Sequence, residues 1–304
     1  RNAVSAHLRR RQIPADVQSH PDIPHRVVIH PQPRRDFPLV SIIIPNRTGS
    51  EESLRRCLAS LFAKTTYRNF EVIIVDENAS IEKVRTITGH YPVKEIVSFP
   101  GPFQLSAFSN LGVKHAGGDF LIFLNSATEV STPSWMEILL FHMELPDVGV
   151  VGPLLTCPDG TVRHAGIVLS ASGTICHAMR GFPHHSDGYA GSLSCTREVS
   201  AVAGACMMTR GDLFMKAGGF VEYYDVQGQD VDLCLRIREM GKRILITPRC
   251  VLLSHERVDD ASVGNFLDRA LLLDTWGKRI EKGDPYYNPN FSRDSCDYRF
   301  DGAS

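Results

Sequence analysis

The sequence lacks an excess of charge of either sign. Its 33 Lys and Arg residues nearly balance its 34 Asp and Glu residues, which gives a formal net charge of −1 at pH 7. Proteins that bind polyanions usually carry a net positive charge or a strongly basic surface. The composition therefore does not indicate a polyanion-binding protein, and we expect no nucleic acid among its partners.

Long apolar runs and closely spaced cysteines are also missing. No run approaches the roughly 18 apolar residues that cross a bilayer, and the N-terminus lacks the apolar core of a secretory signal. The eight cysteines are scattered without a CxxC pair, and several lie inside apolar stretches. This distribution favours reduced thiols in a cytosolic protein over a disulfide framework or a zinc site.

Two phosphate-binding signatures are absent as well. Neither GxGxxG nor GxxxxGK[ST] follows the first predicted strand, so the sequence has no dinucleotide fingerprint and no P-loop. What is present is an ordinary globular composition, with 43% hydrophobic and 22% charged residues among 304. That length fits one large α/β domain with additions, or two small domains.

The N-terminal part differs from the rest of the chain. Residues 1–37 contain Arg9-Arg10-Arg11 and a high density of prolines, which predicts a basic, extended connector without a core of its own. The sequence begins at Arg1 and not at Met. We expect it to be a piece of a longer polypeptide with further domains.

A strand, a helix and a second strand follow the connector. Val40–Ile44 is a β-branched run that stops at Pro45, as is typical of a strand buried on both faces. Apolar residues then recur at helical spacing over 54–62, and Phe70–Val75 forms a second strand that ends at Asp76. Parallel strands joined in this way end at the same edge of a sheet.

Later segments continue this alternation. We predict strands at 95–98, 120–124, 148–155, 243–248 and 250–253, a further apolar run at 199–209, and helices at 106–115, 135–143 and 230–240. In open α/β sheets, ligands bind beyond the carboxyl ends of the strands. The candidate site residues therefore lie at 45–48, 76–80 and 125–129, and in the turn before Asp230.

Five segments resemble, in order, the family 2 glycosyltransferases, which are inverting enzymes with a GT-A fold. The segments are PLVSIIIPNRTGSEESLRRCLASLFAKTTYRNFEVIIVDENAS, GPFQLSAFSNLGVKHAGGDFLIFLNSATEV, PDGTVRHAGIVL, VSAVAGACMMTR and GQDVDLCLRIREMGKRILITP. The nearest subgroup is the rhamnosyltransferase-like enzymes of bacterial polysaccharide and O-antigen assembly. The resemblance implies an α/β GT-A domain over 38–292, with a Rossmann-like, mostly parallel sheet flanked by helices and a smaller acceptor-side sheet. Residues 293–304 form a tail.

The resemblance also implies site residues and ligands. Asp230, in GQDVDLC, matches the general base that deprotonates the acceptor hydroxyl. The positions that match the donor pocket are Pro45, Asn46 and Thr48 for the nucleotide, Asp76 and Asn78 for the base and ribose, Ser106 and Asn110 for the diphosphate, and Asn125 and Ser126 at the following strand end. Gly204, Ala205 and Asp232 match the acceptor side. The implied donor is a dTDP- or UDP-linked sugar, the acceptor is a glycan or lipid-linked glycan, and the location is cytoplasmic or peripheral at the inner membrane.

Three positions depart from the family. Asn46 and Thr48 stand where its members often have Thr and Asp, and the third departure concerns a metal ligand. Members of the family end the strand at 120–124 with an acidic triplet whose last Asp holds Mg²⁺ or Mn²⁺, and here that position is Ala127. A methyl group has no lone pair, whereas a hard divalent cation takes oxygen ligands. Asn125 offers a neutral oxygen, and His255, in LSHE, matches a histidine that often completes the metal site. Arginines at 47, 163 and 257 are candidates to replace the metal charge.

Two functional hypotheses follow. The first is an active inverting transferase that moves a sugar, for example rhamnose, to a bacterial glycan. The second is a catalytically weakened domain that binds nucleotide sugar or glycan, which Ala127 motivates. Asp230 and His255 also have purely structural interpretations, as a helix cap and as a surface histidine. A metal site at His177, His184 and His185 is less favoured, because their flanks are typical of a loop.

Overall fold

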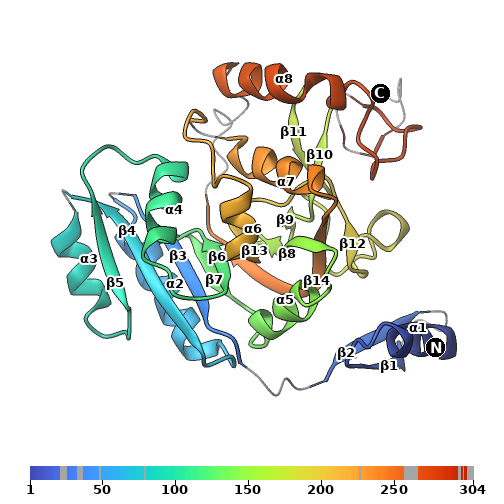
Figure 1. Ribbon diagram of the computed structural model, residues 1–304, viewed down its shortest axis with the longest axis horizontal. Helices are drawn as coiled ribbons and strands as arrows, with labels where there is room; N and C mark the ends of the chain where they lie inside the picture. Colours follow the sequence, from blue (N-terminus) through green and yellow to red (C-terminus); the bar gives the residue numbers. More distant parts are fainter. Residues whose placement is uncertain are drawn as a thin grey trace.

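A ten-stranded sheet forms the centre of the computed structural model, which describes residues 1–20, 26–32, 37–47, 49–78, 80–225, 227–256, 266–293, 296, 298 and 299 (Figure 1). The predicted site residues Thr48 and Arg257 lie outside these ranges, as does most of the predicted tail. The strand order is β12-β14-β8-β13-β6-β3-β4-β5, with β7 paired to β14 and β9 paired to β8. These strands are β3 (Val40–Pro45), β4 (Phe70–Glu77), β5 (Glu95–Phe99), β6 (Phe120–Leu124), β7 (Thr128–Val130), β8 (Val148–Thr156), β9 (Val162–His164), β12 (Arg197–Glu198), β13 (Cys206–Arg210) and β14 (Arg243–Ser254).

The sheet has a parallel half and a mixed half. Strands β5, β4, β3 and β6 run parallel to one another, and β14 runs parallel to β8. Strand β13 runs antiparallel to both of its neighbours, β6 and β8. A separate antiparallel pair consists of β10 (Ile167–Leu169) and β11 (Ile175–His177). The large, mostly parallel sheet with a smaller sheet beside it confirms the predicted fold class.

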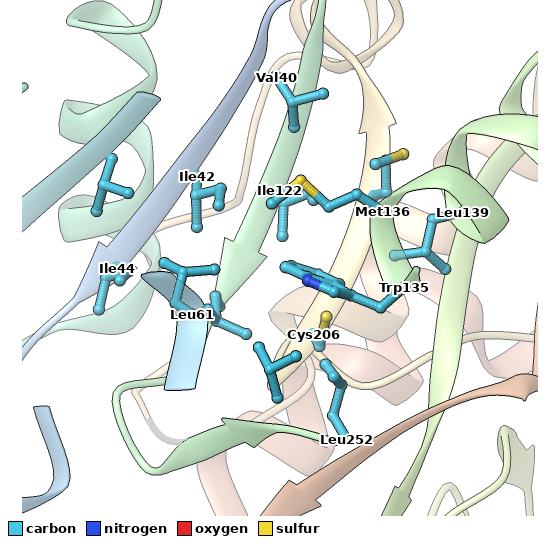
Figure 2. Close-up of a cluster of buried hydrophobic side chains, with 14 of the residues drawn as sticks. Val40, Ile42, Ile44, Leu61, Ile122, Trp135, Met136, Leu139, Cys206 and Leu252 are labelled. Carbon is cyan, nitrogen blue, oxygen red and sulfur yellow. The ribbon is translucent and has the colours of Figure 1, made fainter. Parts of the chain in front are cut away.

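Helices cover both faces of the sheet. They are α2 (Glu51–Lys64), α3 (Ile81–Thr88), α4 (Leu105–Lys114), α5 (Trp135–Met143), α6 (Gly211–Lys216), α7 (Gln229–Glu239) and α8 (Phe266–Ile280), with a short 3-10 turn at Tyr189–Gly191. Alternate side chains of β3 enter opposite cores. Ile42 and Ile44 pack toward α2 and α5 around Trp135 (Figure 2), while Ile43 packs in the core that also contains residues of α6 and α7. This two-sided burial explains the continuous apolar run of β3.

The N-terminal segment is more ordered than an extended connector. Helix α1 (Asn2–Arg10) precedes an antiparallel hairpin of β1 (Ala15–Ser19) and β2 (Val27–Pro31), and these elements lie beside the main body (Figure 1). Within the described part of this segment, Leu8 is the only buried apolar side chain. Arg26 connects the hairpin to the main body, because its Nη1 lies 2.6 Å from Asp187 Oδ1. The boundary at residue 37 stays a prediction.

One expected pair of strands was wrong, and some other segments carried no predicted element type. The two strands expected at 243–248 and 250–253 are one strand, β14, with a register shift between Thr247 and Val251. Pro248 lies inside this shift, and a proline cannot donate to the ladder. The apolar run at 199–209 is a strand only from Cys206 onward. Helix α3 was not predicted. Within the described ranges, no helix is long and apolar enough to cross a membrane.

Candidate functional site

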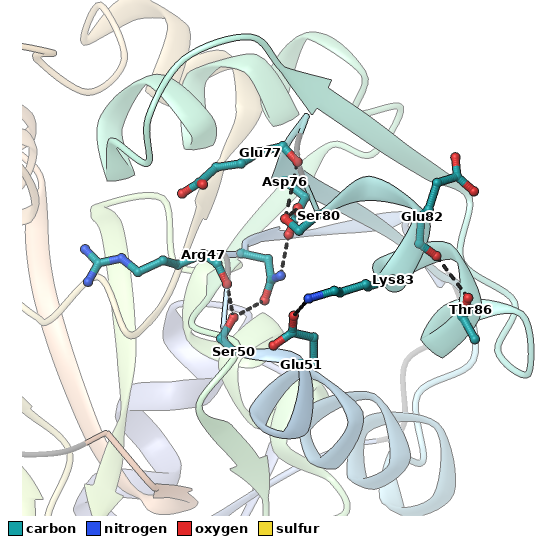
Figure 3. Close-up of polar contacts among 10 residues, drawn as sticks. Arg47, Ser50, Glu51, Asp76, Glu77, Ser80, Glu82, Lys83 and Thr86 are labelled. Atoms are coloured by element: carbon teal, nitrogen blue, oxygen red, sulfur yellow. Dashed lines mark hydrogen bonds and ion pairs between the residues drawn. The ribbon is translucent and has the colours of Figure 1, made fainter.

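Asp76 is fixed by side chains at the ends of β3 and β4. Its carboxylate is 0% exposed, and it accepts hydrogen bonds from the Asn46 amide at Oδ2 and from the Ser80 hydroxyl at Oδ1 (Figure 3). The Ser50 hydroxyl donates to Asn46 Oδ1 over 2.8 Å, which extends the network to α2. Burial raises the pKa of Asp76, while the bonds from Ser80 and Asn46 oppose that rise. The structure thus brings two predicted donor-pocket residues into direct contact.

Three further side chains line the same edge. Pro45 ends β3 opposite Val75. Asn78 follows β4, and its Oδ1 accepts a hydrogen bond of 2.9 Å from the Ser98 hydroxyl of β5. The Arg47 guanidinium lies over the Phe103 ring, 4.6 Å from its centroid. Among the described residues Arg47 has no ion-pair partner, so its charge is available at this edge.

Helix α4 begins beside these strand ends. Ser106 lies in its first turn, and the Ser106 hydroxyl is buried without a hydrogen-bond partner in the described structure. Free N–H groups at the start of a helix attract anions, and a hydroxyl adds a further donor. The start of α4 therefore has the chemistry that its predicted role beside a diphosphate requires.

Two amide side chains of α4 and its cap hold the 220–224 loop. Asn110 donates to the Phe220 carbonyl over 2.9 Å and to Glu222 Oε1 over 2.8 Å, and its Oδ1 accepts from the Phe220 N–H at 3.0 Å. Gln104 donates to the carbonyls of Glu222 and Tyr224 at 2.9 and 2.8 Å. Because its polar atoms are engaged here, Asn110 positions the loop, and its contact with a diphosphate stays a prediction.

The chain turns sharply after β6. Asn125 donates its N–H to the Ala205 carbonyl over 2.9 Å, and its Oδ1 accepts the Ala127 N–H over 2.8 Å. Such a side-chain to backbone bond two residues on is an Asx turn. Ser126 is buried in this turn, and the Ala127 carbonyl accepts the His255 N–H at 2.9 Å. The turn therefore presents the Ala127 methyl group just after the end of β6.

The remaining candidate metal ligands beside this turn are engaged with each other. His255 Nε2 lies 3.0 Å from Glu129 Oε2, and Lys64 Nζ lies 2.9 Å from Glu129 Oε1. The Lys64 hydrogen bond, followed by that of His255, holds the pKa of Glu129 below its usual value. In the parts of the chain that the structure describes, no three His, Cys, Asp or Glu side chains gather as a metal site. A divalent cation at this turn would have to displace Lys64 and His255 from Glu129, since Ala127 adds no side-chain oxygen.

Asp230 occupies the first turn of α7. Its Oδ2 accepts the Gly204 N–H over 2.8 Å, and its Oδ1 accepts the Val231 N–H over 2.9 Å. Gly228 precedes the helix at φ +103°, where a Cβ would lie 2.8 Å from the Tyr224 ring. Burial raises the pKa of Asp230, and the Gly204 and Val231 N–H groups oppose that rise. The result is a partly exposed carboxylate with increased proton affinity.

Asp232 lies two residues further along, and its carboxylate is engaged in contacts inside the protein. Arg236 forms an ion pair with its Oδ2 at 2.7 Å, and the Trp276 Nε1–H donates to its Oδ1 over 2.9 Å. Only 4% of the Asp232 side chain is exposed. These contacts fasten α7 to α8, and an acceptor-side role for Asp232 stays a prediction.

A histidine pair supports the turn that holds Asp230. His164 Nε2 accepts N–H groups from Gly166 at 3.3 Å and from Ala203 at 3.1 Å, so its proton lies on Nδ1, 2.9 Å from His177 Nδ1. Burial lowers the pKa of His164 well below its usual value and that of His177 to about 4, which keeps both rings neutral. Ala203 precedes Gly204, so His164 fixes the turn that orients Asp230.

The histidine metal hypothesis gains no support from this geometry. His177 is engaged with His164, and His184 Nδ1 lies 2.8 Å from the Gly160 carbonyl. The rings of His184 and His185 meet edge to face. The described residues therefore place no shared ligand position among these three histidines.

Several buried polar atoms in the described ranges lack a hydrogen-bond partner. They include Gln229 Oε1, one residue before Asp230, the Tyr224 hydroxyl and Arg163 Nη1. The other guanidinium nitrogen of Arg163 lies 3.2 Å from Glu256 Oε2, and the Glu256 charge acts on Asp230. An unpaired buried polar group is costly and marks a place where a ligand or water completes the bonding. The sequence analysis did not name Tyr224, Gln104 or His164 as site residues. Of the three, only His164 could have been noticed from the sequence, because it is a histidine beside an apolar stretch.

Comparisons with known proteins agree with this geometry. The family described as glycosyl transferase family 2 matches residues 41–217. The O-antigen biosynthesis protein RfbC of Myxococcus xanthus is 35% identical over 305 residues, which cover 97% of this chain but 23% of that protein. The N-acetylglucosaminyl-diphospho-decaprenol L-rhamnosyltransferase of Mycobacterium tuberculosis is 24% identical over 67% of this chain and 72% of its own length.

The fold recurs in a solved structure. The mannosyltransferase PcManGT from Pyrobaculum calidifontis, in complex with GDP-Man and Mn²⁺, aligns with a TM-score of 0.57 over 91% of this chain and 71% of its own. At 17% identity this likeness concerns the fold alone, which is GT-A. Together with the match over residues 41–217, these findings establish that the chain belongs to glycosyl transferase family 2.

Proposed function

We propose that this chain transfers a sugar, with inversion, from a nucleotide-diphosphate donor to a glycan acceptor in bacterial O-antigen-type synthesis. The proposal rests on Asp230, whose carboxylate lies at the start of α7 against the Gly204 N–H, next to the turn that follows β6. Two relatives, an O-antigen biosynthesis protein and a rhamnosyltransferase, support rhamnose as the sugar and a lipid-linked glycan as the acceptor. Because the chain spans 23% of RfbC, further domains of a longer protein belong to the same proposal.

Asp230 is the proposed general base. It takes the proton of the acceptor hydroxyl while that oxygen bonds to the anomeric carbon, and the bond from that carbon to the diphosphate oxygen breaks. One displacement of this kind inverts the configuration. Burial raises the pKa of Asp230 above its ordinary 3.8, so the rate falls as the pH falls through that raised pKa.

The donor diphosphate is proposed to lie between the strand ends and α4. The Ser106 hydroxyl and the first turn of α4 supply donors, and Arg47 supplies a charge on the same side. Asn46, Asp76 and Asn78 shape the pocket for the nucleoside of a dTDP- or UDP-linked donor. Cationic side chains of this kind stabilise a leaving diphosphate without a metal.

A second candidate function follows from Ala127. Its methyl group occupies the carboxylate position, and its neighbours Glu129 and His255 are already paired. A domain built in this way binds a nucleotide sugar or a glycan without turning it over at a useful rate. The two candidates share the pocket and differ only in turnover.

The deciding experiment compares two isosteric Asp-to-Asn changes. Asp230→Asn is expected to lower the transfer rate by about a hundredfold or more, because general-base catalysis contributes about 10²–10⁴. Donor affinity, measured by calorimetry, stays unchanged. Asp212→Asn, the matched control, changes an exposed acid of α6 that pairs with Lys216, and keeps the wild-type turnover.

Unchanged turnover in Asp230→Asn would contradict the proposed base. If the wild-type chain binds the donor but transfers nothing, and Ala127→Asp gains transfer, the weakened-domain candidate replaces the first.

A further inference from the structure

A second cavity lies at the opposite end of α7 from Asp230. It has a volume of about 500 Å³, within the range of about 300–1,000 Å³ typical of small-molecule sites. Its lining consists of Leu169, Arg238, Arg279, Lys282, Gly283, Asp284, Pro285, Tyr287, Pro289, Arg293 and Cys296. Eight residues of helix separate Asp230 from Arg238, or about 12 Å at 1.5 Å per residue. The cavity is therefore distinct from the site around Asp230.

The lining of this cavity is strongly cationic. Arg238, Arg279, Lys282 and Arg293 all belong to it, and among the lining residues that the structure describes Asp284 is the only acid. The Asp284 Oδ2 accepts the Leu169 N–H at 3.0 Å and its Oδ1 accepts the Tyr286 N–H at 2.9 Å. These bonds hold the acid in place, and its single negative charge offsets one of the four positive charges.

Two of the four cations are held by neutral partners. Arg238 lies over the Tyr286 ring at 5.1 Å from its centroid. Arg293 Nη2 donates to the Glu281 carbonyl over 3.1 Å. A Cβ at Gly283 would lie 2.7 Å from that nitrogen, so a glycine allows this close approach. Aromatic and carbonyl contacts orient a guanidinium without cancelling its charge.

The other two cations leave the cavity under-neutralised. Lys282 has no ion-pair partner among the described residues, and Arg279 pairs with Glu239, whose side chain is 59% exposed. Burial lowers the pKa of Arg279, and the nearby charge of Arg238 lowers it further. Cations that oppose one another in a partly enclosed space are stabilised by a bound anion.

We propose that this cavity binds a phosphate-bearing ligand, at a site separate from the donor pocket and from Asp230. Guanidinium groups match phosphate oxygens with paired hydrogen bonds, and a lysine adds a point charge. Two sources share this chemistry, namely the diphosphate of a lipid-linked acceptor and a soluble phosphate compound.

Calorimetric titration of the full chain with inorganic pyrophosphate tests the site. Lys282→Gln combined with Arg293→Gln is expected to weaken binding about tenfold or more, because each charged hydrogen bond contributes up to about a tenfold factor. Lys282→Gln alone, which removes an exposed and unpaired side chain, weakens it about threefold without affecting folding. The matched control, Lys114→Gln with Lys278→Gln, removes two exposed lysines outside the cavity and stays within twofold.

The proposal is overturned if the control double variant loses as much pyrophosphate affinity as the cavity double variant. It is also overturned if the cavity double variant binds pyrophosphate as tightly as the wild type. Steady-state transfer to a prenyl diphosphate-linked acceptor then separates the two sources. A KM increase for that acceptor alone, with the donor KM unchanged, assigns the ligand to the lipid-linked acceptor. Unchanged KM values, with pyrophosphate binding lost, assign it to a soluble compound. The calorimetric result does not require transfer, so it can fail independently of the proposed function.

Discussion

Asp76 and Asp230 are two carboxylates near the same sheet, and burial raises the pKa of both. Asp76 is completely enclosed, and side chains of Asn46 and Ser80 occupy its oxygens. Asp230 is partly exposed, and backbone N–H groups hold it in place.

The difference fits the two roles that we propose for these acids. Side-chain donors from two elements make Asp76 a connection between the loops that follow β3 and β4. Backbone donors orient Asp230, a residue of intermediate exposure, as the proposed base requires. A raised pKa alone therefore does not identify a base, because the partners and the exposure of the carboxylate decide what it can do.

The largest expected effect is on stability, at Asp76. Asp76→Ala leaves the Asn46 amide and the Ser80 hydroxyl without their acceptor, and each buried unsatisfied group costs about 1–3 kcal/mol. We expect the free energy of unfolding, measured by urea denaturation, to fall by about 2–4 kcal/mol. Asp230→Ala is the counterpart and is expected to lose about 1 kcal/mol or less, since water reaches its partners. Equal losses for the two variants would remove the distinction.

An intermediate effect is expected at His164. His164→Leu leaves the Ala203 N–H without an acceptor, which loosens the turn that orients Asp230. The kcat for transfer should fall about tenfold, equivalent to about 1.4 kcal/mol, with the donor KM unchanged. His164→Gln keeps an acceptor in reach and should recover most of the kcat. A parallel rise in donor KM, or no recovery with Gln, would indicate a general loss of structure instead.

The smallest expected effect concerns metal. Because Ala127 offers no oxygen ligand and Glu129 is paired with Lys64, EDTA should change the wild-type transfer rate by less than about threefold. Ala127→Asp places a carboxylate beside Asn125 and should make transfer respond to Mn²⁺. Ala127→Asn, of similar size without the charge, is the control. Wild-type transfer abolished by EDTA refutes this expectation.

The sequence predicted the elements whose pattern is local. The β-branched run at Val40–Ile44 and the helix at Trp135–Met143 were predicted correctly, because burial on both faces and helical periodicity leave clear traces. The hairpin before residue 37 was missed, although Val27-Val28-Ile29 in β2 is a β-branched run, because the prolines around it favour an extended connector. Strand β14 was divided in the prediction, because Pro248 is a turn signal that a register shift accommodates.

The candidate site was predictable only in part. Asp230 and the turn at Asn125–Ala127 were placed from motifs, and the structure brings them together through Ala205 and Gly204. The partners of Asp232 come from Arg236 and Trp276, the latter 44 residues away, and no sequence pattern indicates such a contact. Contacts between side chains far apart in the sequence form only when the chain packs. These contacts determine which acids are hydrogen-bonded or ion-paired inside the protein.

The reversed strand β13 gives the molecule a modular character. The chain leaves β8 after Thr156 and returns in β13 at Cys206, directly opposite Leu124 of β6. The intervening residues 157–205 add β9 and β12 to the same sheet, beside β8 and β14, and form the separate β10 and β11 pair. This segment includes Gly204, whose N–H binds Asp230, so one continuous stretch of chain reaches the proposed base while β3 and β4 precede it in the sequence. A chimera that exchanges this stretch between relatives, with one junction at each end, tests whether it sets the acceptor.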